Sequence, residues 1–278
     1  MFISSWNDWK VKKTGVDGVQ RKDDLRIILQ KPTKSDLDVA RGISIIEDMR
    51  LDISTLKTFI KNPVLVGAYC LGITGAPGVG KSTFMNRLIS THDFGSHKVA
   101  ILAIDPSSRI TNGAVLGDRI RITQNSVFEN LYFRSIASRG AYGGLSDSIE
   151  TILCFLANCK FTLVLIETVG VGQNEVDIAK YADLVIHVLD SNAGDEVQME
   201  KAGVMEVGDL YFVNIRDEQI NHQFISNLQS FASYSNTISS KKATVVVGSA
   251  LSGEGFGEIS IQLDALTNCF ELVGLEAE

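Results

Sequence analysis

The segment Gly75-Ala76-Pro77-Gly78-Val79-Gly80-Lys81-Ser82 decides the fold, because it matches the pattern G-x-x-x-x-G-K-[ST] without a mismatch. The apolar stretch Val66–Thr74 before it predicts a buried strand, and Ser82–Ser90 after it predicts a helix. Glycines let consecutive backbone N–H groups converge on an anion, and the helix N-terminus adds partial positive charge. We therefore predict a bound nucleoside triphosphate, with Lys81 on the β- and γ-phosphates and the Ser82 hydroxyl on Mg²⁺. A plain glycine-rich turn with a capping serine would not need both glycines, the lysine and the serine at this spacing.

Short apolar runs alternate with helix-length segments along the rest of the chain. Such near-continuous apolarity is typical of parallel strands that are covered on both faces. The sequence therefore predicts an α/β fold with a doubly wound, mostly parallel sheet, and a ligand site beyond the carboxyl ends of the strands. The predicted strands are Tyr69–Thr74, Val99–Ile104, Leu131–Ile136, Thr162–Ile166, Leu184–Leu189, Leu210–Val213 and Ala243–Val247, with helices at Ser146–Ala157, Glu196–Glu206 and Glu218–Ser233.

The region before the first strand is of a different kind. Residues 35–64 contain an amphipathic pattern that predicts one or two helices, with Ser35 as N-cap and Asp38 in the first turn. Residues 1–34 are polar and show no period, so we expect a loose arm there. Residues 65–278 then make up the P-loop domain.

Composition narrows the classes of partner. The net charge of −7 and the isoelectric point near 5.2 disfavour a nucleic-acid partner, since no basic stripe would offset the phosphate backbone. No secretory signal and no apolar run long enough to span a membrane is evident. The four cysteines lack disulfide or zinc spacing, which predicts free thiols in a reducing cytoplasm: Cys70, Cys154, Cys159 and Cys269.

Two predicted strands run directly into carboxylates. Glu167 ends Phe161–Ile166 and stands where a magnesium-binding acid is expected, and Gly170 would let a backbone N–H approach the γ-phosphate. Asp105 follows Val99–Ile104 and is a candidate to bind Mg²⁺ through water or to orient the attacking water. Asp118 is another candidate in a glycine-containing loop, although, taken alone, a solvated loop acid is the simpler explanation.

Two further segments suggest a guanine pocket. The strand Leu210–Val213 leads into Asn214-Ile215-Arg216-Asp217, where Asn214 would fix the loop and Asp217 would accept hydrogen bonds from guanine. Ile215 stands where the lysine of an N-K-x-D motif is usual and cannot supply its charge. The run Ser249-Ala250-Leu251 resembles the S-A-x segment that contacts guanine O6 through its backbone. Together these residues favour GTP over ATP.

The motifs resemble the MeaB/ArgK/MMAA family of SIMIBI-class P-loop GTPases. Members of that family are G-protein chaperones of adenosylcobalamin-dependent acyl-CoA mutases, and older names call them arginine/ornithine transport ATPases or kinases. The resemblance covers roughly residues 36–258 and rests on GITGAPGVGKST, AILAIDPSSRITNGAVLGDRIR, FRSIASRGAYGGLS, ETVGVGQNEVDIAKYAD, LDSNAGDEVQMEKAG and GSALSGEG.

The resemblance implies roles for individual residues. Lys81, Ser82 and Thr83 would bind phosphate and Mg²⁺, and the Mg²⁺-proximal acids of the family match Asp105, Asp118 and Glu167. The segment Asp190–Gly203 matches a mobile loop that answers to the mutase, and Lys201 matches its functional lysine. A homodimer is also implied, although only Gly257–Glu278 follows the last motif and we expect an altered dimer mode.

Rival functions remain open at this point. A glutamine directly after Gly170 is absent, because Val171 occupies that place, and we therefore expect slow intrinsic hydrolysis. A P-loop kinase or a transport-associated ATPase would share the phosphate motif but not the guanine residues. A nickel metallochaperone would need a Cys/His cluster near the nucleotide, which the sequence does not offer, and a degenerate nucleotide-binding scaffold has only Ile215 in its favour.

Overall fold

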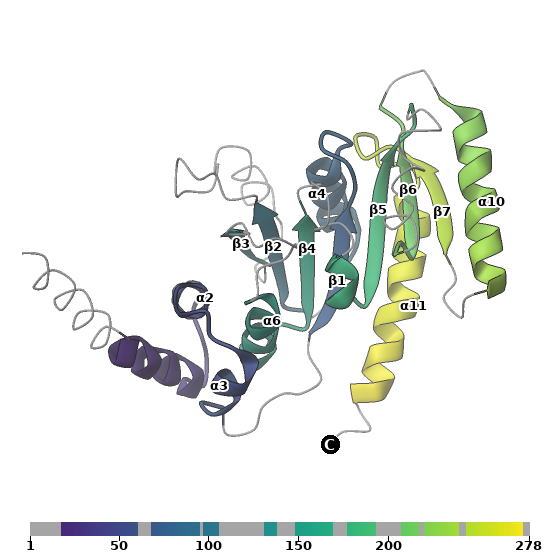
Figure 1. Ribbon diagram of the computed structural model, residues 1–278. Helices are drawn as coiled ribbons and strands as arrows, with labels where there is room; N and C mark the ends of the chain where they lie inside the picture. Colours follow the sequence, from purple (N-terminus) through teal and green to yellow (C-terminus); the bar gives the residue numbers. More distant parts are fainter. Residues whose placement is uncertain are drawn as a thin grey trace, which may run out of the picture. The chain divides into compact units, whose positions relative to one another are not determined.

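Seven parallel strands form one sheet in the part of the chain that the computed structural model describes, which is residues 18–60, 68–94, 97–105, 131–137, 148–168, 177–192, 207–216, 220–238 and 243–274. The order across the sheet is β3-β2-β4-β1-β5-β6-β7 (Figure 1). The strands are β1 (Tyr69–Thr74), β2 (Val99–Asp105), β3 (Leu131–Ala137), β4 (Leu163–Thr168), β5 (Leu184–Asp190), β6 (Leu210–Asn214) and β7 (Thr244–Gly248).

Every predicted strand is confirmed, and strand ends differ from the prediction by at most two residues. All residues of β1, β4 and β6 are buried, which is why the central strands read as continuous apolar runs rather than as alternating ones. The apolar stretch before the P-loop was also predicted to start as early as Val66, which lies outside the described residues. The predicted helix Glu196–Glu206 lies outside the described residues.

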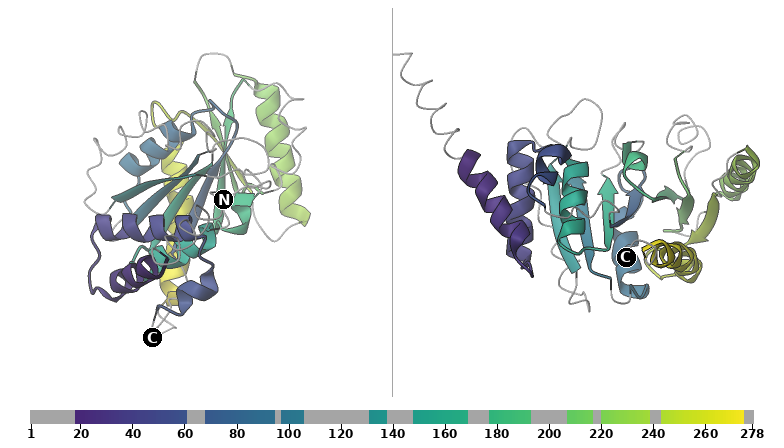
Figure 2. Two further views of the ribbon diagram at one scale, coloured as in Figure 1. Left: turned by 60° about the vertical axis from the view of Figure 1, so that its left-hand side comes forward. Right: turned by 90° about the horizontal axis from the view of Figure 1, so that it is seen from below.

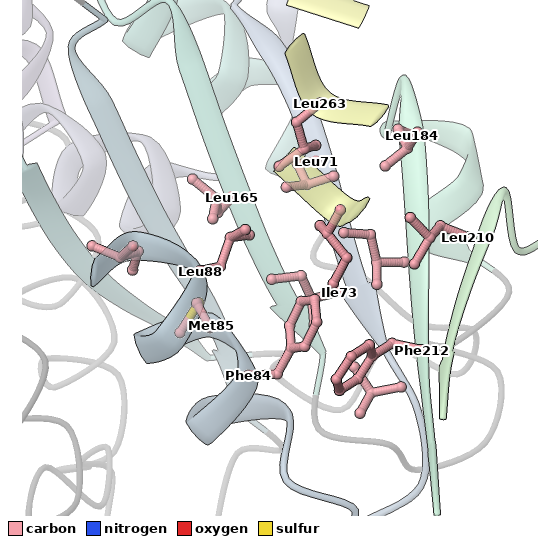
Figure 3. Packing of buried hydrophobic residues seen from close by; sticks show 14 of the residues in the cluster. Leu71, Ile73, Phe84, Met85, Leu88, Leu165, Leu184, Leu210, Phe212 and Leu263 are labelled. Carbon is pink, nitrogen blue, oxygen red and sulfur yellow. The ribbon is translucent and has the colours of Figure 1, made fainter. Parts of the chain in front are cut away.

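Helices cover both faces of the sheet, as a doubly wound fold requires. On β6, Leu210 and Phe212 face a cluster with α4 (Lys81–Thr91) and α11 (Phe256–Gly274), as Figure 3 shows for Phe84, Met85, Leu88 and Leu263. The alternate residues Tyr211 and Val213 instead pack with Phe224 and Leu228 of α10 (His222–Ile238). Figure 2 shows α10 and α11 on opposite sides of β7. The predicted α/β fold is therefore confirmed.

Aromatic rings fasten the helix that follows the P-loop to the sheet. Phe84 of α4 lies with its ring centroid 4.8 Å from that of Phe212 and 5.1 Å from that of Phe256, and the latter two rings are 5.4 Å apart. Offset and edge contacts of this kind stabilise beyond simple burial. Because one ring comes from each of α4, β6 and α11, the cluster fixes where the N-terminus of α4 points.

The chain changes direction at β1, which lies between β4 and β5. After β1 the chain continues to β2 on one side, and after β4 it crosses to β5 on the other side. In open parallel sheets, ligands bind beyond the carboxyl ends of the strands at such a switch point. The segment Gly75–Ser82 leaves the carboxyl end of β1 and thus stands at this point.

The N-terminal helices pack with a helix from the middle of the chain. Helix α2 (Asp36–Met49) and helix α3 (Ile53–Lys57) both contact α6 (Ile149–Asn158). The contacts divide the chain into Met1–Ala68 with Asp147–Thr162 and, separately, Tyr69–Ser146 with Leu163–Glu278. The predicted boundaries between the N-terminal arm, the helical segment and the P-loop domain, at residues 34 and 64, stay predictions.

The capping predicted at Ser35 is present. The Ser35 hydroxyl accepts the Asp38 N–H, and the Asp38 carboxylate accepts the Ser35 N–H, which is a complete capping box. The expected loose arm is wrong for residues 18–30, which are helical and bury Leu25 and Ile28. The two buried positions span less than one helical turn, which is too short to show a helical period in the sequence.

The cysteines whose side chains are described are free thiols, as predicted: Cys70, Cys154 and Cys159. Burial, followed by the nearby Asp183 carboxylate, raises the pKa of the Cys70 thiol, so this group is an inert core residue. Among the described residues no helix is both long and apolar enough to cross a membrane.

Candidate functional site

The P-loop between β1 and α4 needs glycine at two positions. Gly75 has a φ of 138°, and a Cβ atom there would lie 2.1 Å from the Val188 carbonyl oxygen of β5. Gly80 has a φ of 100°, and a Cβ atom there would lie 2.6 Å from the Asn214 amide nitrogen. At both positions the backbone has a positive φ and another strand lies close to it. A residue with a side chain is therefore excluded by the neighbouring strand as well as by the loop conformation.

The N-terminus of α4 is open toward solvent. Its N-cap is Gly80, which provides no side-chain cap for the first N–H groups of the helix. The following residues Ser82 and Thr83 are exposed, and so are Pro77 and Gly78 on the loop. Backbone donors at a helix N-terminus, together with the helix dipole, favour an anion at this place.

Lys81 is directed back over the loop that precedes it. Its side chain is 7% exposed, and its Nζ donates to the Gly75 carbonyl at 2.8 Å and to the Ala76 carbonyl at 2.9 Å. Hydrogen bonds from an ammonium are stronger than neutral ones, so these contacts stabilise a buried cation inside the loop. A lysine held here faces the space that the loop surrounds.

Ser82 and Glu167 meet although 85 residues separate them. The Ser82 hydroxyl donates to Glu167 Oε1 at 2.7 Å, and Glu167 lies beside Ile73 in the pairing of β4 with β1. The Thr168 hydroxyl donates to that of Thr74 at 3.2 Å, which ties the two strand ends together. Hydroxyl and carboxylate oxygens are the ligands that Mg²⁺ prefers, so this pair fits a magnesium ion.

The remaining predicted acids are only partly described. Asp105 is the last residue of β2, and β2 pairs with β4 up to Ile104 opposite Thr168. Its backbone therefore lies at the same edge of the sheet as Glu167, while its side chain lies outside the described part. Asp118, Gly170, Lys201 and Asp217 lie outside the described residues, and their roles stay predictions.

Asn214 joins the P-loop to the Ser249–Leu251 segment. Its side chain is 3% exposed; Nδ2 donates to the Val79 carbonyl at 2.8 Å, and Oδ1 accepts the Ala250 N–H at 2.9 Å. The geometry is that of an asparagine that fixes the loop, as the sequence predicts. It also engages the Ala250 N–H, so that group is directed at Asn214 rather than outward.

Two arginines complete the site, and neither role was predicted from the sequence. Arg87 of α4 donates through Nε to the Ala250 carbonyl at 3.3 Å and through Nη2 to the Leu251 carbonyl. Arg216 donates through Nη1 to the Gly78 carbonyl at 2.8 Å and pairs with Asp190. The role of Arg87 could not be predicted from the sequence, because this arginine follows the P-loop motif among ordinary helix residues. The role of Arg216 could have been inferred, since this arginine lies inside the tetrad that starts at Asn214.

Comparison with known proteins identifies the family. A family model described as "Methylmalonyl Co-A mutase-associated GTPase MeaB" matches residues 40–278. The chain belongs to this family. The resemblance drawn from the P-loop, ETVGVGQ and GSALSGEG segments is thereby confirmed.

Relatives of this MeaB-family chain include a protein of Pyrococcus horikoshii, 42% identical over 183 residues that cover 65% of this chain and 57% of the relative. The GTPase ArgK of Escherichia coli is 34% identical over 189 residues, which cover 66% of this chain and 56% of ArgK. The chain therefore spans little more than half the length of these relatives. A crystal structure of a LAO/AO transport system kinase has the same fold, with a TM-score of 0.64, 24% identity, and coverage of 92% of this chain and 78% of that one.

Proposed function

We propose that this MeaB-family protein binds GTP and GDP with Mg²⁺ and hydrolyses GTP. The observation that carries the proposal is the convergence of Lys81, the Ser82–Glu167 pair and Asn214 at one edge of the sheet. Lys81 and Ser82 belong to the P-loop, whereas Glu167 and Asn214 come from two other motifs and contact Ser82 and Val79 of the P-loop. An incidental glycine-rich turn would not assemble them.

We propose that separate groups of the chain bind the phosphates and the magnesium ion. Lys81 donates to the β- and γ-phosphate oxygens, and the N–H groups of Gly78–Thr83 surround them. Ser82 and Glu167, with Asp105 and Asp118, would hold the magnesium ion directly or through water. When bound, Mg²⁺ neutralises the charge that develops on the phosphate oxygens. Gly170 would offer its N–H to the γ-phosphate.

The base would lie between two loops that Asn214 already holds together. Asp217 would accept hydrogen bonds from the guanine ring N–H and amine. Because Asn214 holds the Ala250 N–H, another backbone group of Ser249–Leu251 would face O6. Ile215 would cover the flat face of the base without supplying a charge. Guanine selectivity is therefore expected, but weaker than with an intact N-K-x-D motif.

The output of the GTPase is proposed to be regulatory. The family description names an association with methylmalonyl-CoA mutase, which supports an adenosylcobalamin-dependent acyl-CoA mutase as the partner. Intrinsic hydrolysis would be slow, because no glutamine directly follows Gly170, and the mutase would accelerate it by ordering Asp190–Gly203 with Lys201. The protein would act as a homodimer in the cytoplasm that gates cofactor loading and protects the mutase.

Nucleotide binding is tested by calorimetry with GTP, GDP and ATP, each with Mg²⁺. We expect GTP and GDP to bind better than ATP, and Lys81→Ala to abolish binding of all three. Lys34→Ala is the matched control, since Lys34 is a partly exposed lysine that also donates to a backbone carbonyl, that of Lys31. Unchanged affinity in folded Lys81→Ala would remove the phosphate-site assignment. Equal competition by ATP would favour the rival function of a kinase or a transport-associated ATPase.

The partner is tested by GTP turnover with and without a cobalamin-dependent acyl-CoA mutase from the same organism. The unaltered protein is expected to be stimulated, whereas Lys201→Ala keeps the basal rate and loses the stimulation. Equal stimulation of both proteins would remove the role of Lys201. No stimulation by any such mutase would remove the chaperone proposal and leave the GTPase proposal standing.

A further inference from the structure

The base-recognition tetrad lacks its usual lysine, yet it carries a cation one residue later. Ile215 occupies the lysine position, and Arg216 follows it. Arg216 does not point away from the site: its Nη1 donates to the Gly78 carbonyl at 2.8 Å. Gly78 lies in the middle of the P-loop, in the turn that its φ of 79° creates.

Asp190 holds the same guanidinium from the other side. Asp190 ends β5 and lies opposite Asn214 in the parallel pairing with β6, so Asp190 and Arg216 leave the sheet at the same edge. The Asp190 carboxylate pairs with Arg216 Nη2 and accepts the Asn192 N–H at 3.0 Å. Its side chain is 17% exposed, and that of Arg216 is 48% exposed. A charge-assisted contact with a carboxylate that is itself held restricts where the arginine can go.

Arg216 and Asn214 together orient two successive peptide groups of the loop. Arg216 holds the Gly78 carbonyl, and Asn214 holds the Val79 carbonyl at 2.8 Å. In a trans peptide the C=O and N–H groups point in opposite directions. Fixing the two carbonyls toward β6 therefore directs the N–H groups of Val79 and Gly80 into the loop. The long 3.5 Å contact from the Val79 N–H to the Ala76 carbonyl, inside the loop, agrees with this direction.

We propose that Arg216 is a positioning residue of the nucleotide site that takes over the place of the missing lysine. It holds the P-loop at Gly78 in a shape that receives phosphate, and Asp190 holds Arg216 in turn. Arg216 touches no reacting atom in this role, so it governs nucleotide affinity and residence time rather than the chemical step. The inference rests on the proposed binding of guanine nucleotides.

The expected effects follow from the exposure of each group. Arg216→Met keeps most of the side-chain stem and removes the guanidinium, and we expect about tenfold weaker GDP binding through faster dissociation. Asp190→Asn should weaken binding only about twofold, because a half-exposed ion pair contributes little by itself. On the Arg216→Met background, Asp190→Asn should add nothing, since Asp190 acts through the arginine.

The decisive variant moves the cation back by one residue. Ile215→Lys combined with Arg216→Met restores a cation at the usual lysine position and should recover most of the lost GDP affinity. Dissociation rates of a fluorescent GDP analogue and calorimetric affinities are the readouts, together with the thermal midpoint of each variant. Arg21→Met is the matched control, because Arg21 is 47% exposed and is paired with Asp48, as Arg216 is with Asp190. This control should leave both nucleotide constants unchanged.

The outcomes separate this inference from the proposed function. An unaltered protein that binds neither GDP nor GTP would overturn the proposed function and this inference with it. If the unaltered protein binds GDP and Arg216→Met binds it equally well, only the role of Arg216 is wrong. A weakened Arg216→Met that a lysine at position 215 does not restore would also overturn it, because a purely structural arginine gives that result.

Discussion

Replacing Asn214 by alanine tests how the two loops of the site are held together. Asn214 lies at the end of β6 and makes two hydrogen bonds within the core of the site, one to the Val79 carbonyl and one from the Ala250 N–H. Val79 is 4% exposed and Ala250 is 1% exposed. Asn214→Ala would therefore leave a carbonyl and an amide without their partner where water has little access.

The expected loss of stability follows from these two groups. A buried polar group that loses its partner costs about 1–3 kcal/mol, so two of them cost about 2–6 kcal/mol of unfolding free energy. We expect about 3 kcal/mol, because shortening the side chain leaves room in which one of the two groups can recover a contact with water. Nucleotide affinity should fall as well, since the loops are no longer joined.

The matched control is Asn236→Ala. Asn236 also makes two backbone hydrogen bonds, with Nδ2 donating to the Ala243 carbonyl at 3.0 Å and Oδ1 accepting the Ala243 N–H at 2.6 Å, but it is exposed. Water replaces it, so we expect a loss of about 1 kcal/mol or less. Urea unfolding followed by far-ultraviolet circular dichroism measures both variants, with equal m-values as the condition for comparison. Similar losses at the two asparagines, or less than about 1 kcal/mol at Asn214, would refute the reasoning.

Two further predictions concern the N-terminal helices. The Lys31 ammonium, which donates to Asp38 at 2.5 Å, and then Ser35 lower the Asp38 pKa from 3.8 to about 2. Because the pKa of Asp38 is lower in the folded than in the unfolded chain, its carboxylate stabilises the fold above pH 3.8, and this contribution is lost as the pH falls to about 2. The free energy of unfolding should therefore fall less steeply with decreasing pH in Asp38→Asn. A Cβ atom on Gly42 would lie 2.1 Å from the Phe155 ring, so Gly42→Ala should cost about 1–3 kcal/mol in thermal unfolding, and adding Phe155→Leu should recover part of it.

The sequence was sufficient to predict the sheet, for reasons that particular strands make clear. Strands such as β1 and β4 are buried along their whole length, so their apolar runs are as long as the strands themselves. Gly75–Ser82 follows β1 and Glu167 lies near the end of β4, and the sequence alone is enough to recognise the chemistry of both. The Ser82–Glu167 contact was predictable because parallel strands bring their carboxyl ends to one edge.

Other features depend on contacts that no local pattern encodes. The helix at residues 18–30 buries Leu25 and Ile28, and nothing in its own sequence shows that these two side chains are covered. Helix α6 packs with α2 and α3, although its sequence position lies between two strands of the sheet. An amphipathic pattern indicates that one face of a helix packs against another element, but it does not indicate which element.

The P-loop carbonyls are likewise held partly by a residue of the motif itself and partly by residues that are distant in the sequence. Lys81 holds the carbonyls of Gly75 and Ala76 and belongs to the motif itself. Two carbonyls further along the turn, those of Gly78 and Val79, are held by Arg216 and Asn214, more than 130 residues away in the sequence. The glycines of the motif permit the loop conformation, but they do not select it, since glycine is free to adopt many others. Selection comes from donors on β6 and the residues just after it. A P-loop pattern in a sequence therefore predicts where phosphate binds, whereas the rigidity of that site depends on side chains at the carboxyl end of another strand.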